Sequence, residues 1–170
     1  MTEMRAPDVL AFLDLVEEQG IRIWLDGGWA VDACLGRQTR AHADLDIVIE
    51  QKDLDVVADA LRARGYAPAP RKNPLPWNFA LGDPAGHEVD FHVIVVNAHG
   101  DGIYGPPENG ESYPNEALVG FGSIKGRAVA CITPEWLVRF HSSYEPDDVD
   151  RADVAALCAR FGIPLPRGYY

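Results

Sequence analysis

Hydrophobic and polar residues recur along the chain with two different periods. Apolar side chains three or four positions apart predict amphipathic helices, which cover residues 7–18, 29–35, 53–64, 133–144 and 147–161. Short runs of β-branched and aromatic residues predict strands, which cover residues 21–25, 44–50, 78–81, 88–96, 117–124 and 127–132. Strands and helices are therefore mixed up to residue 132, and the pattern after it is helical.

This order of elements predicts an α+β fold in which helices flank a mixed β-sheet. A chain of 170 residues fits one ordinary domain. We expect residues 1–132 to form the sheet-containing core and residues 133–170 to form a short C-terminal helical segment. The two parts are either separate units or one continuous domain.

Glycine and proline mark the connections between the predicted elements. Residues 26–28, Asp-Gly-Gly, predict a turn, and Asp53 is the expected N-cap of the helix over residues 53–64. Residues 68–77 hold four prolines, which predicts an exposed extended loop. Residues 99–114 predict a second long loop, which either faces a substrate or is mobile.

The chain is acidic, with 26 aspartate and glutamate residues against 15 lysine and arginine residues and a formal net charge of −11. This balance disfavours general binding to the phosphates of DNA or RNA, which requires a basic surface. It suits a cationic or neutral small molecule, or a metal ion. We therefore expect a small-molecule partner and no nucleic-acid partner.

Signals for export and for membrane insertion are missing from the sequence pattern. The N-terminal residues do not combine a basic start with an uninterrupted apolar core, and no run reaches the roughly 18 apolar residues of a membrane-spanning helix. Cys34, Cys131 and Cys158 match neither a disulfide framework nor a zinc-ligand spacing. We expect a cytoplasmic monomer or homodimer with no membrane partner.

Three aspartates carry the main chemical signal. Asp44 and Asp46 are two positions apart on a predicted strand, so their side chains leave the same face, and Asp90 lies on another predicted strand. If these strands are neighbours, the carboxylates converge, and two carboxylates about 4 Å apart repel by roughly 4 kcal/mol at an effective dielectric near 20. Mg²⁺ prefers oxygen ligands and would relieve this repulsion. The alternative is that each aspartate caps a turn or faces solvent.

A glycine pair lies upstream of these aspartates. Gly27 and Gly28 join a predicted buried strand to a helix, where backbone N–H groups can hold a phosphate; the alternative is an ordinary tight turn. A phosphate cradle followed by a carboxylate pair on the next strand indicates metal-bound triphosphate chemistry. Arg40 and His42 lie between the two motifs and are candidates to neutralise phosphate. Arg40 is the better candidate because a guanidinium binds phosphate bidentately, although it is equally an ordinary surface arginine.

Three further side chains are candidates to contact a substrate. His92 follows Asp90 by two positions and so faces the same side of its strand, where it either contacts substrate or packs as a half-buried histidine. Tyr104 and Tyr113, within residues 99–114, are candidates to line an acceptor pocket.

The sequence resembles a known enzyme family over most of its length. The segment WLDGGWAVDACLGRQTRAHADLDIVI, residues 24–49, resembles the signature of the small antibiotic nucleotidyltransferases, the lincosamide and aminoglycoside O-nucleotidyltransferases of the polymerase-β-like superfamily. The segment EVDFHVI, residues 88–94, is similar to the strand that carries the third carboxylate of that family, and residues 141–157 resemble its C-terminal segment more loosely. The resemblance implies a nucleotidyltransferase core and an Mg²⁺-dependent adenylyltransferase.

The implied reaction transfers a nucleoside monophosphate, AMP from ATP, to a hydroxyl of a small antibiotic-like molecule. In it Asp44 and Asp46 bind one or two Mg²⁺ ions, while Gly27 and Gly28 hold the triphosphate of ATP or another nucleotide. Asp90 completes the metal site or accepts the proton of the attacking hydroxyl. The acceptor oxygen attacks the α-phosphorus in line, and pyrophosphate leaves.

One position departs from the family pattern. The C-terminal helix of the family often opens with a lysine beside its aspartates, whereas this chain has Arg151 there. Arg151 replaces that lysine, or Lys72 or Lys125 does, or the contact is missing.

A different class of function stays open at this point. A minimal nucleotidyltransferase of a toxin–antitoxin system would modify a protein or RNA partner. The acidic charge weighs against RNA, and the long segment 99–114 favours a pocket over a flat interface.

Overall fold

The computed structural model describes residues 2–170, and its centre is a nine-stranded mixed sheet. The strands are β1 (Ile23–Leu25), β2 (Asp44–Glu50), β3 (Ala67–Pro68), β4 (Asn78–Gly82), β5 (Glu88–Val96), β6 (Gly102–Tyr104), β7 (Ser112–Tyr113), β8 (Gly120–Ile124) and β9 (Arg127–Cys131). The helices are α1 (Ala6–Glu18), α2 (Gly27–Leu35), α3 (Gln51–Arg62), α4 (Pro134–His141) and α5 (Asp148–Phe161). The predicted α+β fold class is confirmed.

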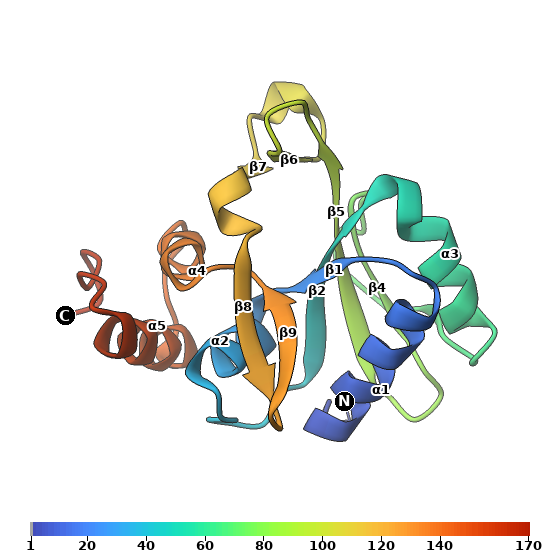
Figure 1. Cartoon of the computed structure of the whole chain (residues 1–170), viewed down its shortest axis with the longest axis horizontal. Coiled ribbons are helices and arrows are strands. Elements are labelled where there is room, and N and C mark those ends of the chain that lie inside the picture. Colours follow the sequence, from blue (N-terminus) through green and yellow to red (C-terminus); the bar gives the residue numbers. More distant parts are fainter. Residues whose placement is uncertain (1) are drawn as a thin grey trace.

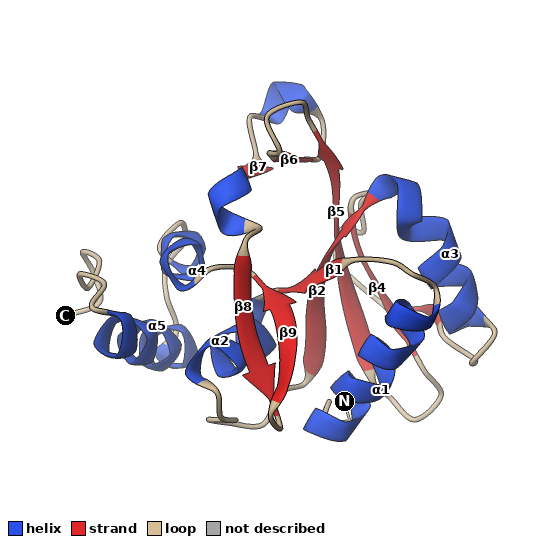
Figure 2. Cartoon of the chain, viewed as in Figure 1, coloured by secondary structure: helices blue, strands red, loops and turns tan. Residues whose placement is uncertain are grey.

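The strands follow the spatial order β3-β4-β5-β2-β1-β9-β8 (Figure 2). β2 and β5 are parallel neighbours, and β1 runs antiparallel to β2 on its other side. β6 and β7 form a small extension that pairs with the end of β5. Helices α1 and α3 lie on one side of the central strands, and α2, α4 and α5 lie on the other (Figure 1).

The two central strands are apolar on one face and begin with polar residues on the other, where Val48 and Ile94 then continue as buried apolar side chains. Every second side chain of β2 and β5 is fully or almost fully buried, which fixes these strands in the core; the set is Leu45, Ile47, Ile49, Val89, Phe91 and Val93. The opposite face carries the half-buried polar side chains Asp44, Asp46, Glu88, Asp90 and His92. Because a strand alternates its faces with a period of two, burial of the apolar set holds the polar set in place.

Two connections differ from the sequence-based expectation. Helix α3 begins at Gln51 and its N-cap is Glu50, so the prediction of Asp53 as the cap is wrong. The reason is that β2 continues into the helix without a loop. The predicted turn at residues 26–28 is also shorter than expected, because Gly27 and Gly28 already form the first turn of α2.

The two predicted long loops contain regular structure. Residues 99–114 hold β6, β7 and a 3-10 turn at Pro107–Asn109, so the expectation of an irregular loop is wrong there. The strand predicted from residue 117 starts at Gly120, after a 3-10 turn at Asn115–Ala117. In the proline-rich segment 68–77, Pro68 pairs in β3, and the residues that follow are mostly exposed as predicted.

The C-terminal helices pack on the sheet-containing part of the chain. Helix α5 begins with a capping box between Asp147 and Asp150, and it packs against α4 and α2. The boundary after residue 132 stays a prediction. Across residues 2–170, every helix is too short or too polar to cross a lipid bilayer. Cys34, Cys131 and Cys158 carry free thiols.

Candidate functional site

A row of three aspartates crosses the middle of the sheet on its polar face. Asp46 of β2 is directly paired with Asp90 of β5 in the parallel register. Asp26, which follows β1, donates its backbone N–H to the carbonyl oxygen of Asp46 at 2.9 Å. Asp44 lies two residues before Asp46, at the start of β2, opposite Glu88. The structure therefore brings Asp44, Asp46 and Asp90 together, and it adds two carboxylates that the sequence did not single out.

The five carboxylates of Asp26, Asp44, Asp46, Glu88 and Asp90, which we call the carboxylate edge, repel one another. Burial raises the pKa of Asp46 to about 7; the nearby His92 opposes this shift, while the charges of Asp44, Asp26 and Asp90 add to it. The pKa of Asp44 is also raised, first by burial and then by the charge of Asp90. A group whose charged form is disfavoured in this way gains from a nearby cation. The edge therefore has the charge and the oxygen atoms that a hard divalent cation requires.

A guanidinium from the proline-rich segment already contacts part of this edge. Arg71 donates from Nη2 to Asp90 Oδ1 at 2.7 Å, and its Nη1 lies 2.8 Å from Glu88 Oε2. That buried glutamate oxygen accepts no well-directed hydrogen bond. Within residues 2–170, no three His, Cys, Asp or Glu side chains are already arranged to hold a metal ion. Sequence reasoning missed Arg71, because 19 positions separate it from Asp90 and no local pattern links them.

Asp26 connects four parts of the site. Its Oδ1 accepts the N–H of Gly27 at 2.8 Å, which caps α2, and its Oδ2 accepts the hydroxyl of Tyr113 at 2.8 Å. His92 Nδ1 lies 3.1 Å from the same Oδ2, and His92 Nε2 lies 4.0 Å from Asp46 Oδ1. Burial opposes the charged imidazolium, but the hydrogen bond and charge of Asp26, together with Asp46 and Asp90, raise the pKa of His92 to about 9. Asp26 thus positions His92 and favours its charged form.

The glycine pair lies in tight contact with the rest of the site. Gly27 has a positive φ of 54°, and a Cβ at this position would lie 2.2 Å from Asp46 Oδ2. A Cβ on Gly28 would lie 2.5 Å from Arg40 Nη2 and 2.6 Å from His42 Nδ1. Only glycine fits at either position. Within residues 2–170 the N–H of Gly28 has no hydrogen-bond partner, so it is available at the N-terminus of α2.

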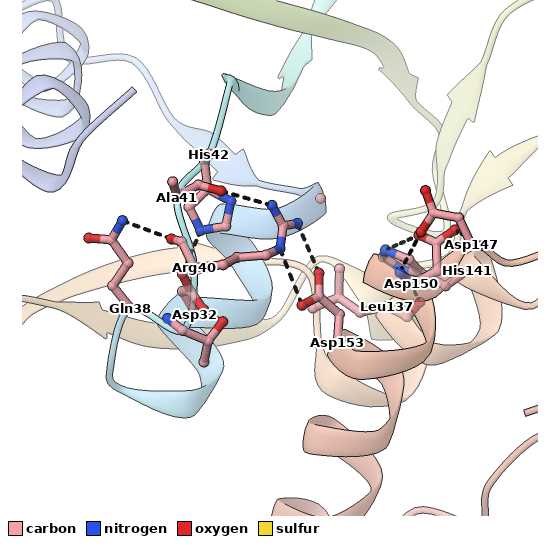
Figure 3. A network of polar contacts seen from close by, with 12 residues as sticks. Asp32, Gln38, Arg40, Ala41, His42, Leu137, His141, Asp147, Asp150 and Asp153 are labelled. Atoms are coloured by element: carbon pink, nitrogen blue, oxygen red, sulfur yellow. Dashed lines mark hydrogen bonds and ion pairs between the residues drawn. The ribbon is translucent and has the colours of Figure 1, made fainter. Parts of the chain in front are cut away.

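Arg40 and His42 both form contacts within the protein. Figure 3 shows Arg40 extending from the segment after α2 to Asp153 on α5, with Nη2 at 2.9 Å from Oδ2. His42 is buried, and its Nε2 lies 2.5 Å from Oδ2 of the buried Asp32. The Arg40–Asp153 pair joins the core to the C-terminal helices. Arg40 keeps 34% of its side chain exposed. The phosphate contacts expected of Arg40 and His42 stay predictions.

The two predicted tyrosines pack against His92 and against each other. Tyr113 is buried and bonded to Asp26, which differs from the expected loop side chain that faces a pocket. Tyr104 is half-buried, and its ring packs edge-on to that of His92 at a centroid distance of 5.8 Å. Arg151 donates to the carbonyl oxygen of Gly168 in the C-terminal tail. Roles for these residues in binding substrate or phosphate stay predictions.

Replacing Tyr113 by phenylalanine is expected to lower the free energy of unfolding by about 1.5 kcal/mol, because a buried charged acceptor loses a hydrogen bond. The change leaves Asp26 Oδ2 with His92 as its remaining partner. Urea denaturation measures the effect. Tyr144→Phe is the matched control, since it removes the bond from an exposed tyrosine to Asp150 and should cost less than about 0.5 kcal/mol. Equal losses in the two variants would contradict the role given to Asp26.

Comparisons with known proteins agree with this geometry. The sequence profile of the aminoglycoside-2''-adenylyltransferase family matches residues 8–157. A lincosamide resistance protein of Staphylococcus haemolyticus is 30% identical over 150 residues, which cover 88% of this chain and 92% of that protein.

Two solved structures share the fold. The crystal structure of the lincosamide antibiotic adenylyltransferase LnuA with lincomycin bound superimposes with a TM-score of 0.82 at 29% identity, covering 96% of this chain and 100% of that one. ANT(2")-Ia in complex with adenylyl-2"-tobramycin superimposes with a TM-score of 0.71 at 20% identity, covering 92% of this chain and 89% of that one, and this match concerns the fold alone.

Proposed function

Because the chain belongs to the aminoglycoside-2''-adenylyltransferase family, we propose that it transfers the adenylyl group of ATP to a hydroxyl of an antibiotic, either a lincosamide or an aminoglycoside. The observation that carries this proposal is the paired register of Asp46 and Asp90 on neighbouring parallel strands, with Asp44 on the same face. The relatives described above are named as antibiotic-modifying or resistance proteins, and none supports the toxin–antitoxin alternative.

The carboxylate edge fits Mg²⁺ by its chemistry. Asp44 and Asp46 would hold the ion, with Asp90 either completing the ligand set or accepting the proton of the acceptor hydroxyl. The raised pKa values of Asp44 and Asp46 support this assignment, because burial and then neighbouring carboxylates disfavour their charged forms, which a cation would stabilise. When bound, Mg²⁺ would neutralise the negative charge of the nucleotide phosphates.

The remaining groups of the chain orient the reactants. The free N–H of Gly28 and the N-terminus of α2 would bind phosphate oxygens. The cationic His92 faces the same carboxylates and would offset the charge that develops on phosphate. An oxygen of the acceptor then bonds to the α-phosphorus of ATP, the bond from that phosphorus to the leaving oxygen breaks, and pyrophosphate departs.

The choice of acceptor class rests on two features. The net charge of −11 suits any acceptor that carries a basic amine, and this includes both antibiotic classes. The match that spans most of both chains is to a lincosamide resistance protein. We therefore place lincosamides first and aminoglycosides second.

Incubation with ATP, Mg²⁺ and single antibiotics of both classes is the test. We expect mass spectrometry to find an acceptor that is heavier by one AMP, with release of pyrophosphate, for at least one compound. The His92→Gln variant should give the same product at a rate that is reduced about tenfold, because it removes one positive charge from the carboxylate edge. Binding of ATP without modification of any acceptor would refute the proposed antibiotic substrate.

A further inference from the structure

Arg71 occupies the part of the carboxylate edge that lies on β5. Its guanidinium contacts Asp90 at 2.7 Å and lies 2.8 Å from Glu88, and its side chain keeps only 29% of its surface exposed. The two carboxylates are 15% and 18% exposed, so the three groups form a partly desolvated cluster. Glu88 and Asp90 lie on the same face of the sheet as Asp44 and Asp46 of β2.

The backbone that carries Arg71 is weakly attached to the sheet. Ala69 donates its N–H to the carbonyl oxygen of Ala80, and Leu75 donates to that of Asn78. Between these two anchors, the backbone of residues 70–74 forms no backbone–backbone hydrogen bond within residues 2–170. The segment is thus held against β5 chiefly by the Arg71 side chain, and little other structure would be lost if it moved.

We propose that Arg71 is a positioning residue that acts as an internal counter-cation: it holds Asp90 and Glu88 while the edge is empty, and it is displaced, with segment 70–74, when a divalent cation binds. The proposal rests on the proposed function only in that it takes Asp44, Asp46 and Asp90 as the residues that receive the ion. Arg71 then makes cation entry depend on movement of the segment.

The reason is that the guanidinium and a metal ion compete for the same oxygen atoms. Either role assigned to Asp90, ligand or proton acceptor, is hindered while Arg71 Nη2 holds Oδ1 of that carboxylate. The Arg71 guanidinium and a divalent cation would also repel each other within this partly desolvated cluster. Glu88 belongs to the same competition, because its buried Oε2 lies 2.8 Å from Arg71 Nη1 and has no directed hydrogen bond of its own.

Binding of Mn²⁺ to the whole protein, without nucleotide or acceptor, is the direct test. Electron paramagnetic resonance of free Mn²⁺ should give a dissociation constant about tenfold lower for Arg71→Gln than for the unaltered protein. Lys72→Gln is the matched control, because it removes the same charge from the next, exposed position of the same segment, and its constant should change less than twofold. Equal affinities in the two variants, or weaker binding by Arg71→Gln, would overturn the proposal.

Two further variants separate competition from damage to the fold. Arg71→Lys keeps the positive charge and should bind Mn²⁺ within about threefold of the unaltered protein. In the Asp90→Asn background, Arg71→Gln should improve affinity by less than twofold, since the contested carboxylate is gone. A tenfold gain that persists without Asp90 would refute the competition at that residue.

Movement of the segment has its own measurement. Trypsin should cleave after Arg71 or Lys72 faster when Mn²⁺ is added to the unaltered protein, and a rate that Mn²⁺ leaves unchanged would contradict the displacement. None of these measurements uses ATP or an antibiotic. A protein that modifies no antibiotic but shows the Mn²⁺ effect would therefore refute the proposed function and leave this inference standing.

Discussion

Replacing Asp46 by asparagine is expected to lower the rate of adenylyl transfer about a thousandfold. Asp46 lies in the middle of the aspartate row, between Asp26 and Asp90, and an amide cannot supply the negative charge that a divalent cation requires. Loss of metal-dependent stabilisation worth about 4 kcal/mol corresponds to this factor, since each 1.4 kcal/mol is tenfold. Product formation at saturating ATP and acceptor is the measurement.

The same substitution should leave the fold intact or make it more stable. Burial raises the pKa of Asp46 to about 7, which means that the charged form is disfavoured where it lies. A neutral isostere removes repulsion from its carboxylate neighbours, so the melting temperature should stay the same or rise. Asp55→Asn on the exposed side of α3 is the control and should change neither quantity. Full turnover by the Asp46 variant would exclude a role in metal binding.

Replacing Gly27 by alanine is expected to reduce both stability and activity. The backbone at Gly27 has a φ of 54°, which costs a side-chain-bearing residue about 1 kcal/mol. The added Cβ would also lie 2.2 Å from Asp46 Oδ2, so the carboxylate must move. Overpacking of this kind costs about 1 to 3 kcal/mol more. We expect a total loss of about 2 to 4 kcal/mol in the free energy of unfolding and at least a tenfold loss in turnover.

Gly162 provides the matched control for this prediction. Its φ of 67° lies in the same left-handed region, but a Cβ there would meet nothing within 4 Å. Gly162→Ala should therefore show the backbone cost alone, about 1 kcal/mol, with unchanged turnover. Urea denaturation and a turnover assay on both variants separate the two contributions. If the two alanine variants lost equal stability, contact with Asp46 would not be the cause.

The strands that carry the site could be predicted from the sequence because their signal is local. β2 and β5 have the bounds that alternation and β-branched residues indicated, residues 44–50 and 88–96. The convergence of Asp44, Asp46 and Asp90 depended on one condition, that these two strands are neighbours. The parallel pairing of β2 with β5 meets that condition.

The residues that sequence reasoning missed act over long distances along the chain. Asp26 has the pattern of a turn residue, and only the pairing of β1 with β2 brings it beside Asp46. Tyr113 was a candidate from the sequence, but its contact with Asp26 was not predicted, because it spans 87 positions and depends on the extension β6–β7. The error at Asp53 has a local cause instead: a residue that is a good helix cap was preferred, although β2 continues directly into α3.

The alternation of faces along β2 also determines which changes of length the protein tolerates. Its seven residues are followed by α3 without a loop, so there is no slack at that end of the strand. An inserted or deleted residue within β2 would turn Leu45 and Ile47 towards the carboxylate face and drive both aspartates into the apolar core. A change of length is therefore expected to be tolerated better in the proline-rich segment before β4 than in β2, whose register is fixed by its neighbours.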